Sequence, residues 1–492
     1  MSNISVKESQ SKIKEITRAD KNYEINRRQL SGVMLAIVLF VIILTGLPPS
    51  FDEPSRKMIA IVTVGVVLWV FESLPLGLTA ALIILLLLLL KPVSIDVIYS
   101  GFSSSAVFLI IGGMMLARAV NETSLAKRIT YNILAKWGGT SKGLLACILV
   151  IPQVQSFFIP AAAVRTTLLL PVALDVLDTI GAPPKSHLRK QILLGVAFGG
   201  TISGTAVMTA AIGNILTVNM LNQFLNINIT YFEWFLYALP LWLTLIPGAW
   251  LVLMKCFPLK KEERSFLLVK EEMQKKLSNF GPLNSKEKKC LVILTLTVLL
   301  WMTEPLHGLD LSIPAILGVV LMTLPRIGCA NWSNVVKINF DTIFLLGATL
   351  SLGYALTESG AAKKVGEVMA TPWVLSLIQD PISAVIFILI ATQIFHLIMS
   401  NVSTAVVTLI PIYIGIALEA GINPTFICFT AALTCLHGYI LVVETMPNVI
   451  VHSSGQISQR EYLVPGLYMT LLMMGLTVLI ALTWWKGLGL VP

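Results

Sequence analysis

The chain has 492 residues, of which 56% are hydrophobic and only 12% are charged. Soluble globular proteins carry roughly 25% charged residues, so most of this surface is expected to face lipid rather than water. A net charge of +9 would suggest a nucleic-acid partner for a soluble protein. In a membrane protein it indicates Lys and Arg in cytoplasmic loops, and we expect no nucleic-acid partner.

The first 29 residues form a polar segment with seven basic residues between Lys7 and Arg28. The segment is too long and too mixed in charge for the start of a signal peptide, and no small-residue cleavage site follows the first apolar run. We therefore predict a cytoplasmic N-terminal tail at 1–29. A first transmembrane helix with its connector follows at 30–56.

The apolar segments predict an all-α polytopic membrane protein, because about 20 mainly apolar residues in a helix cross a bilayer. Two segments, 143–178 and 381–419, are interrupted by proline and polar residues and are predicted to be re-entrant hairpins. The others predict eleven spanning helices. These spans lie near 31–49, 57–72, 76–90, 103–120, 190–222, 234–256, 289–306, 311–325, 338–358, 423–452 and 464–487.

The distribution of Lys and Arg tests this layout. With the N-terminus in the cytoplasm and both hairpins returning to their side of entry, cytoplasmic loops contain 28 of these residues and external loops contain six. Basic residues concentrate in cytoplasmic loops of membrane proteins. The asymmetry favours a multi-pass protein of the cell membrane with a cytoplasmic N-terminus.

The two halves of the chain resemble each other. WVFES around Trp69 matches WMTEP around Trp301, and the 20 residues from Phe108 match those from Phe344. We predict two repeats of five spans each, at 57–257 and 289–492, joined by a charged cytoplasmic loop at 258–288. An odd number of spans inverts the second repeat, and inverted repeats with paired broken helices are typical of alternating-access transporters.

Each half contains two interruptions where a small charged molecule could bind. The first half has FIPAAAVRTT from Phe158 and a Gly- and Thr-rich run from Gly195 to Asn214. The second half has MSNVST from Met399 and ETMPN from Glu444. Backbone groups freed by a break must line protein or a cavity. Helix N-termini at such breaks favour anions, and unwound carbonyls favour cations.

These motifs resemble the divalent anion:sodium symporter family of di- and tricarboxylate and sulfate transporters, over nearly all residues after about Arg28. In that family each hairpin tip carries Ser-Asn-Thr and each unwound helix carries a Thr-Pro-Pro-Asn-like turn. SNVST from Ser400 and TMPN from Thr445 match the second half. FIPAAAVR resembles the first hairpin of the 2-oxoglutarate/malate exchanger branch, but here three alanines replace Ser-Asn-Thr. In the unwound helix of the first half, Ala-Ile-Gly-Asn, ending at Asn214, replaces the Thr-Pro-Pro-Asn turn.

The resemblance implies a substrate site built asymmetrically by the two halves. The first half is expected to contribute mainly backbone groups, and the second half mainly side chains. Predicted substrate-binding residues are Arg165, Thr166, Ser400, Asn401, Ser403, Thr404, Thr445, Pro447 and Asn448, with backbone contacts from Ala161, Ala162, Ala163, Gly213 and Asn214.

Three ionisable residues near the breaks have more than one interpretation. Arg165 could offer its charge to a substrate carboxylate, which we favour, or pair with a carboxylate such as Glu444. His396 lies one turn before Ser400 and could serve an ion site or be an ordinary interior histidine. Glu444 could bind a proton or a cation, or satisfy His437 or Arg165. His396 and Glu444 are thus the candidates for a coupling or ion site.

The sequence therefore predicts a secondary transporter, not an enzyme. The resemblance implies C4 or C5 dicarboxylates such as malate, succinate and 2-oxoglutarate, or citrate, as its substrates. A fixed charge at Arg165 favours exchange, because an empty carrier with an unpaired buried charge returns poorly. Sodium- or proton-coupled symport of a dicarboxylate or of sulfate is the alternative. Sodium is a possible coupling ion, and no cofactor or certain metal site is indicated. The family resemblance implies a homodimer in the bilayer.

Two other classes of protein fit the sequence less well. An anion channel would show continuous polarity along its pore, and a membrane-embedded enzyme would show His, Asp or Glu clustered at metal-ligand spacing. Neither pattern is present, and the six cysteines are scattered.

Overall fold

The structure is a computed structural model that describes residues 27–259, 267–369, 371–398 and 402–491. Helices form almost all of the regular structure in this part of the chain. In the first half they are α2 (Arg27–Gly46), α3 (Glu53–Val70), α4 (Leu76–Leu90), α5 (Ile95–Ser100), η1 (Gly101–Ser103), α6 (Ser105–Asn121), α7 (Leu125–Trp137), α8 (Ser141–Ser156), α9 (Ala162–Thr179), α10 (His187–Ile202), η2 (Met208–Ala210), α11 (Ile212–Leu225) and α12 (Tyr231–Cys256).

The second half begins after a connecting helix, α13. Its helices are α13 (Leu267–Asn279), α14 (Ser285–Met302), α15 (Glu304–His307), α16 (Ser312–Thr323), α17 (Trp332–Val335), α18 (Phe340–Glu358), α19 (Ala361–Met369), α20 (Pro372–Ile378), α21 (Pro381–Ile398), α22 (Val402–Ala420), α23 (Pro424–Leu436), η3 (Val442–Glu444), α24 (Met446–Ser453), α25 (Gln459–Ile480) and η4 (Ala481–Trp485).

Several helices are long and apolar enough to cross a membrane. By length and composition six qualify among the described residues, and a seventh is possible if α20 and α21, bent by 115° at their junction, count as one span. Helices α4, α16 and α23 are apolar but shorter. The chain is thus an all-helical polytopic membrane protein, while the full count of eleven spans and two hairpins stays a prediction.

The helices break inside the segments where the sequence predicts interruptions. Helix α8 ends at Ser156 and α9 begins at Ala162, and α22 begins at Val402 after α21. Residues 203–211 separate α10 from α11, and residues 437–445 separate α23 from α24. Pro160, Gly204 and Pro447 lie at or beside these breaks, consistent with the inability of proline and glycine to support a helix interior.

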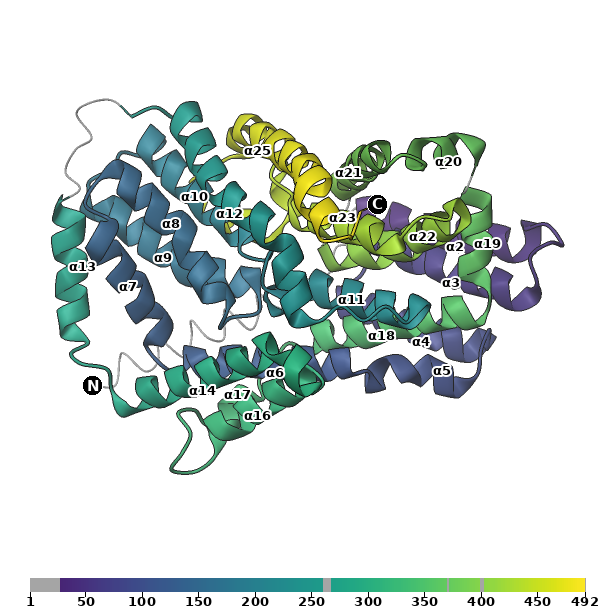
Figure 1. Cartoon of the computed structure of the whole chain (residues 1–492), viewed down its shortest axis with the longest axis horizontal. Coiled ribbons are helices and arrows are strands. Elements are labelled where there is room, and N and C mark those ends of the chain that lie inside the picture. Colours follow the sequence, from purple (N-terminus) through teal and green to yellow (C-terminus); the bar gives the residue numbers. More distant parts are fainter. Residues whose placement is uncertain (1–26, 260–266, 370, 399–401, 492) are drawn as a thin grey trace.

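Beyond the breaks, helices of each half pack against helices of the other half. Helix α11 leaves its own half and packs against α22 and α23, while α24 packs against α9 and α10. In the same way α6 packs against α16, and α4 against α18. In Figure 1, α7 to α10 lie on one side of the molecule, and α3, α18, α19 and α22 lie on the other. The breaks therefore meet where the two halves interlock.

Helix α13 lies within the segment 258–288, for which the sequence predicts only a charged loop. Val269 and Met273, one turn apart, are fully buried, and the helix packs against α7 and α9. Because this apolar stripe is narrow and most other residues of α13 are polar or charged, the sequence of the helix does not resemble a membrane-spanning segment.

Candidate functional site

A cavity of about 180 Å³ lies where the four breaks meet. Both predicted hairpins and both unwound segments contribute to its wall. It is lined by Pro160, Ala161, Ala162, Ala163, Thr201, Gly204, Ala210, Ala211, Ile212, Gly213, Val402, Ser403, Leu436, Thr445, Met446 and Pro447.

Four helices begin at this cavity. The residues just before α9, α11 and α24 are Ala161, Ala211 and Thr445, all extended and none with a side chain that caps its helix. Helix α22 begins with Val402 and Ser403, which also line the wall. The first-turn amides of a helix lack intrahelical partners and carry the positive end of the helix dipole, so this wall is suited to an anion.

Few side-chain oxygens face the cavity. The hydroxyl oxygens of Thr201 and Thr445 lie 3.2 Å apart and join α10 of the first half to the turn before α24. Ser403 is the third hydroxyl-bearing residue of the lining. Thr201 belongs to the Gly- and Thr-rich run of the sequence, yet nothing in the sequence distinguishes it from the other threonines of that run.

The guanidinium of Arg165 is fully buried and bonded to the protein itself. Nε donates to Ser203 Oγ at 2.9 Å, and the terminal nitrogens donate to the carbonyls of Ala210, at 3.1 Å, and Ile159. Arg165 does not line the cavity. It ties the first hairpin tip to the unwound segment between α10 and α11, and Glu444 is not among its bonded partners.

Asn214 and Asn448 also hold the unwound segments from behind the cavity wall. The amide nitrogen of Asn214 donates to Gly204 O at 2.8 Å and Val207 O at 3.3 Å. Both side chains are fully buried, and neither Oδ1 has a hydrogen-bond partner in the described part of the chain. Two unpaired amide oxygens therefore sit at matching places in the two halves.

Among the remaining described candidates, Thr166 and Thr404 do not line the cavity. The Thr166 hydroxyl donates to Ala162 O at 2.9 Å, and Thr404 is buried with its hydroxyl unpartnered among the described residues. Ser400 and Asn401 lie outside the described residues. Ser403, Thr445, Pro447, Gly213 and the three alanines of the first tip line the wall.

His396 and Glu444 lie beside the cavity but do not line it. Both are fully buried. The Glu444 carboxylate accepts hydrogen bonds from the backbone amides of Ile440 at 3.2 Å and Leu441 at 2.9 Å. It thereby closes the turn between α23 and α24.

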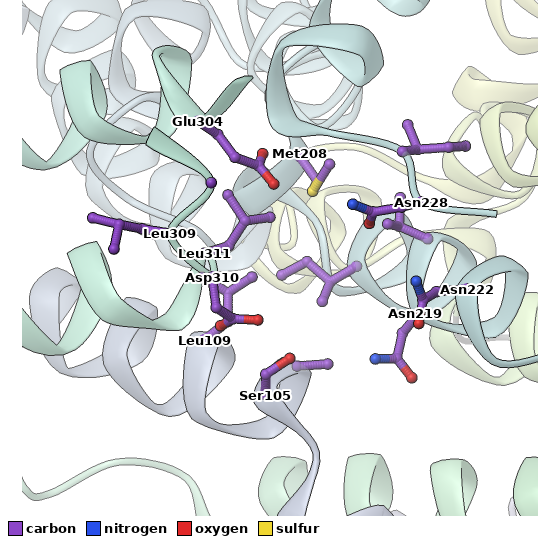
Figure 2. Close-up of a pocket in the computed structure, with 15 residues that line it drawn as sticks. Ser105, Leu109, Met208, Asn219, Asn222, Asn228, Glu304, Leu309, Asp310 and Leu311 are labelled. Carbon is purple, nitrogen blue, oxygen red and sulfur yellow. The ribbon is translucent and has the colours of Figure 1, made fainter. Parts of the chain in front are cut away.

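A second, larger cavity of about 390 Å³ lies elsewhere, between α6, α11 and the loop around α15. Figure 2 shows the carboxyl groups of Glu304 and Asp310 facing the amides of Asn219 and Asn228 across it. One oxygen of Glu304 accepts from the amide of Tyr231 at 2.7 Å and caps the start of α12. Two carboxylates disfavour an anion, so this cavity does not compete with the first as a site for one.

Residues 26–491 match the family described as "Sodium:sulfate symporter transmembrane region". The chain belongs to the sodium:sulfate symporter family. It is therefore a secondary transporter and a multi-pass membrane protein, not an enzyme.

Curated relatives span nearly the whole chain. A sodium-dependent dicarboxylate transporter, SdcS, of Staphylococcus saprophyticus is 23% identical over 487 residues, covering 94% of this chain and 92% of its own length. Its counterpart in Staphylococcus aureus (strain USA300) is 24% identical over 484 residues, covering 93% of this chain and 91% of its own. A membrane protein of Cupriavidus necator is 25% identical over 482 residues, covering 93% of each chain.

Among solved structures, the Alcanivorax borkumensis YdaH transporter shares the fold. The TM-score is 0.56 at 14% sequence identity, and the match covers 94% of this chain and 99% of the other.

Proposed function

We propose that this symporter-family protein carries small dicarboxylates through the cavity between its hairpins by alternating access, coupled to sodium. The observation that carries the proposal is the meeting of four helix N-termini at one cavity, with three of them uncapped by side chains. These amides could bind an anion in place of water, even though no positively charged side chain lines the cavity.

The arrangement of the N-termini favours a substrate with two separated negative charges. Helix α11 packs against α22, and α24 packs against α9, so the four N-termini form two pairs that each combine both halves of the chain. One carboxylate could bind each pair, while Leu436, Ile212 and Met446 contact the carbon chain between them. The volume, about 180 Å³, lies below the roughly 300–1,000 Å³ of drug-sized pockets and suits a small acid. The relatives named for dicarboxylates support this choice over sulfate.

Sodium coupling replaces exchange as the favoured mode. Exchange was expected because Arg165 would present a fixed charge to the substrate, but its nitrogens are bonded to Ser203, Ile159 and Ala210. The unpaired oxygens of Asn214 and Asn448, beside unwound carbonyls, offer the hard oxygen ligands that cations prefer. Two curated relatives are named as sodium-dependent. We infer that sodium enters with the substrate near each turn.

We also propose the full topology of eleven spans with two re-entrant hairpins, in two inverted repeats at 57–257 and 289–492. The exchange of α11 and α24 between the halves supports this proposal. So does the 28-to-6 bias of basic residues, which places the N-terminus in the cytoplasm.

Uptake into proteoliposomes tests the proposed function. Labelled succinate would be offered outside with sodium, potassium or choline at fixed pH, to empty vesicles and to vesicles loaded with succinate. We expect sodium alone to support uptake into empty vesicles, and unlabelled fumarate to compete better than sulfate.

Two results would overturn the proposal in different ways. Uptake that needs internal succinate and ignores sodium would establish exchange. Competition by sulfate alone, with no succinate uptake under any condition, would remove dicarboxylates as the substrate class.

A further inference from the structure

An apolar cavity of about 290 Å³ lies between α3, α11, α18, α19 and α22. It shares no lining residue with the substrate cavity or with the cavity drawn in Figure 2. In Figure 1, α3, α18, α19 and α22 lie together on one side of the molecule. Most of the lining residues are aliphatic and none of them is charged, so this apolar cavity suits an uncharged occupant rather than an anion.

The apolar cavity is long and narrow. Along α3 its wall consists of Ile59, Val62, Thr63, Val66 and Trp69. Residues at this spacing share one face of a helix, and ten residues of helix are about 15 Å long. The four lining residues of α18, from Thr349 to Leu356, have the same spacing. Because the hydrocarbon core of a bilayer is about 30 Å thick, the cavity has about the length of the acyl chains in one leaflet.

Trp69 presents a hydrogen-bond donor without an acceptor. Its side chain is 3% exposed, and Nε1 has no hydrogen-bond partner among the described residues. By contrast Trp301, its counterpart in the second half, donates through Nε1 to Leu311 O at 2.9 Å. Trp69 Cζ3 lies 3.6 Å from the position of a Cβ on Gly65, which leaves the nitrogen on the opposite edge of the ring. A buried donor without an acceptor is costly, and an acceptor in the cavity would remove that cost.

Thr349 adds a second unpaired polar group to the same wall. It is fully buried, and its hydroxyl has no partner in the described part of the chain. The other two threonines of the wall, Thr63 and Thr408, donate to Ile59 O at 2.8 Å and Thr404 O at 2.9 Å, one turn earlier in their own helices. The hydroxyl of Thr349 is therefore free to bond to a molecule in the cavity.

We propose that this apolar cavity binds an uncharged fatty acyl ester from the bilayer, with the ester oxygens bonded to Trp69 Nε1 and Thr349 Oγ1. The aliphatic faces of α3 and α18 would contact the hydrocarbon chain. Pockets that hold small molecules are mostly apolar and contain a few placed polar groups, as this one does. Water suits it less, because each buried water needs two to four polar partners and most of this wall offers none.

The occupant would contact a helix that also reaches the substrate cavity. Val407 and Pro411 of α22 line the apolar cavity, while Val402 and Ser403, at the start of α22, line the substrate cavity. Val407 also packs against the hydrophobic core that α3, α4 and α18 share. The inference goes beyond the proposed function and does not depend on it, because it concerns an uncharged ligand at a separate site.

Photo-crosslinking of the full-length protein in liposomes tests the proposal. The probe is methyl laurate with a diazirine in the middle of its chain. We expect labelling of α3, α18 and α22 in excess over α2, whose apolar side chains are exposed. Unlabelled methyl laurate should compete with the probe. Dodecane, which has no acceptor, should compete at least about threefold less well, the effect of a lost hydrogen bond.

Two results would overturn the proposal. The first is labelling spread evenly over α2 and the helices around the apolar cavity. The second is competition by dodecane that equals competition by methyl laurate, because the two unpaired groups would then not bind the ester.

Val66→Phe should reduce the labelling of α18 and α22 at least about fivefold, because the larger ring occupies the cavity. The matched control is Val464→Phe in α25, at a position that is 57% exposed, and it should label like wild type. Labelling of the Val66→Phe protein at the wild-type level would contradict the proposed site.

Thr349→Val keeps the shape of the side chain and gives a second test through thermal unfolding. Without ligand its unfolding midpoint should equal or exceed that of wild type, because the hydroxyl has no described bond to lose. Thr392→Val is the comparison and should lower the midpoint, since its buried hydroxyl lies 2.9 Å from Tyr413 Oη. Methyl laurate should raise the midpoint of wild type more than that of Thr349→Val. Equal rises in these two proteins, or no rise in wild type, would reject the proposal.

Discussion

Asn214 and Asn448 make the same pair of hydrogen bonds in the two halves of the protein. Asn448 Nδ2 donates to Gly438 O at 3.0 Å and Leu441 O at 3.2 Å, ten and seven residues earlier. Asn214 Nδ2 donates to Gly204 O and Val207 O with the same two spacings. Each amide therefore folds one unwound segment back onto the start of the helix that follows it.

Replacing either asparagine with alanine should damage its unwound segment. Asn448→Ala removes the side-chain donor from the buried carbonyl of Gly438 and one of two donors from that of Leu441, which keeps the amide of Glu444 at 3.3 Å. A buried carbonyl left without a donor costs about 1–3 kcal/mol. We expect a lower thermal unfolding midpoint, a weaker apparent affinity for sodium and little remaining uptake.

The control for these variants is Asn132→Ala. Asn132 is exposed and donates only within its own helix, to Arg128 O at 3.0 Å. It should leave both the midpoint and the uptake near wild type. Unchanged sodium affinity in functional Asn214→Ala and Asn448→Ala proteins would argue that their free oxygens do not face a cation.

Thr201 and Thr445 should contribute a shared polar contact to substrate binding. Thr445→Val keeps the shape of the side chain but removes the hydroxyl. We expect the KM for succinate to rise roughly 2- to 10-fold, the effect of one hydrogen bond, with expression unchanged. Because the two hydroxyls are 3.2 Å apart, the effect of the Thr201→Val/Thr445→Val double variant on KM should be smaller than the two single effects combined.

Thr323→Val is the comparison for both threonine variants, because its hydroxyl bonds only to carbonyls of its own helix. Additive effects of Thr201→Val and Thr445→Val would mean that the two hydroxyls act on the substrate separately.

The breaks in the helices could be predicted from the sequence, but the partners of the buried charge could not. Pro160 marks the interruption predicted within 143–178, where α8 ends at Ser156 and α9 begins at Ala162. The interruption predicted within 381–419 falls at 399–401, outside the described residues. Arg165 is recognisable as a costly intramembrane charge that needs partners. Two of those partners are the backbone carbonyls of Ile159 and Ala210. Every residue has a backbone carbonyl, so the sequence does not show which ones accept these bonds.

Lys142 and Lys185 should lie on the same side of the membrane. They flank the first predicted hairpin, so a segment that returns to its side of entry places both in the cytoplasm. In a background carrying Cys256→Ser, since Cys256 is the one partly exposed native cysteine, Lys142→Cys and Lys185→Cys should both resist an impermeant maleimide in intact cells. Lys364→Cys should react. Labelling of only one of the first two from outside would refute the hairpin.

Replacing Arg165 should lower the stability of the folded protein rather than its affinity for the substrate. Arg165→Gln cannot make all three hydrogen bonds, and bonds to a charged group contribute about 1.5–3 kcal/mol each. We expect a large fall in the thermal unfolding midpoint and in uptake, whereas Arg118→Gln, at an exposed position, should change neither. A stable Arg165→Gln protein with a greatly raised KM for succinate would instead place the guanidinium at the substrate.

Replacing Gly200 should disturb the contact between the first predicted hairpin and the second unwound turn. It lies in α10, where a Cβ would be 2.3 Å from Thr166 Oγ1 and 3.1 Å from Pro447 Cβ. Glycine in a helix interior normally costs roughly 0.5–1 kcal/mol relative to alanine, so Gly→Ala should stabilise where there is room. Gly475→Ala in α25 meets no atom within 4 Å and should stabilise slightly or have no effect.

Gly200→Ala should destabilise the protein, because the methyl group would push the first hairpin away from the turn at Pro447. We expect a lower unfolding midpoint and a loss of uptake that higher succinate concentrations do not restore. A Gly200→Ala protein that transports like Gly475→Ala would mean that the contact between α10 and the second unwound turn is not needed in the transport cycle.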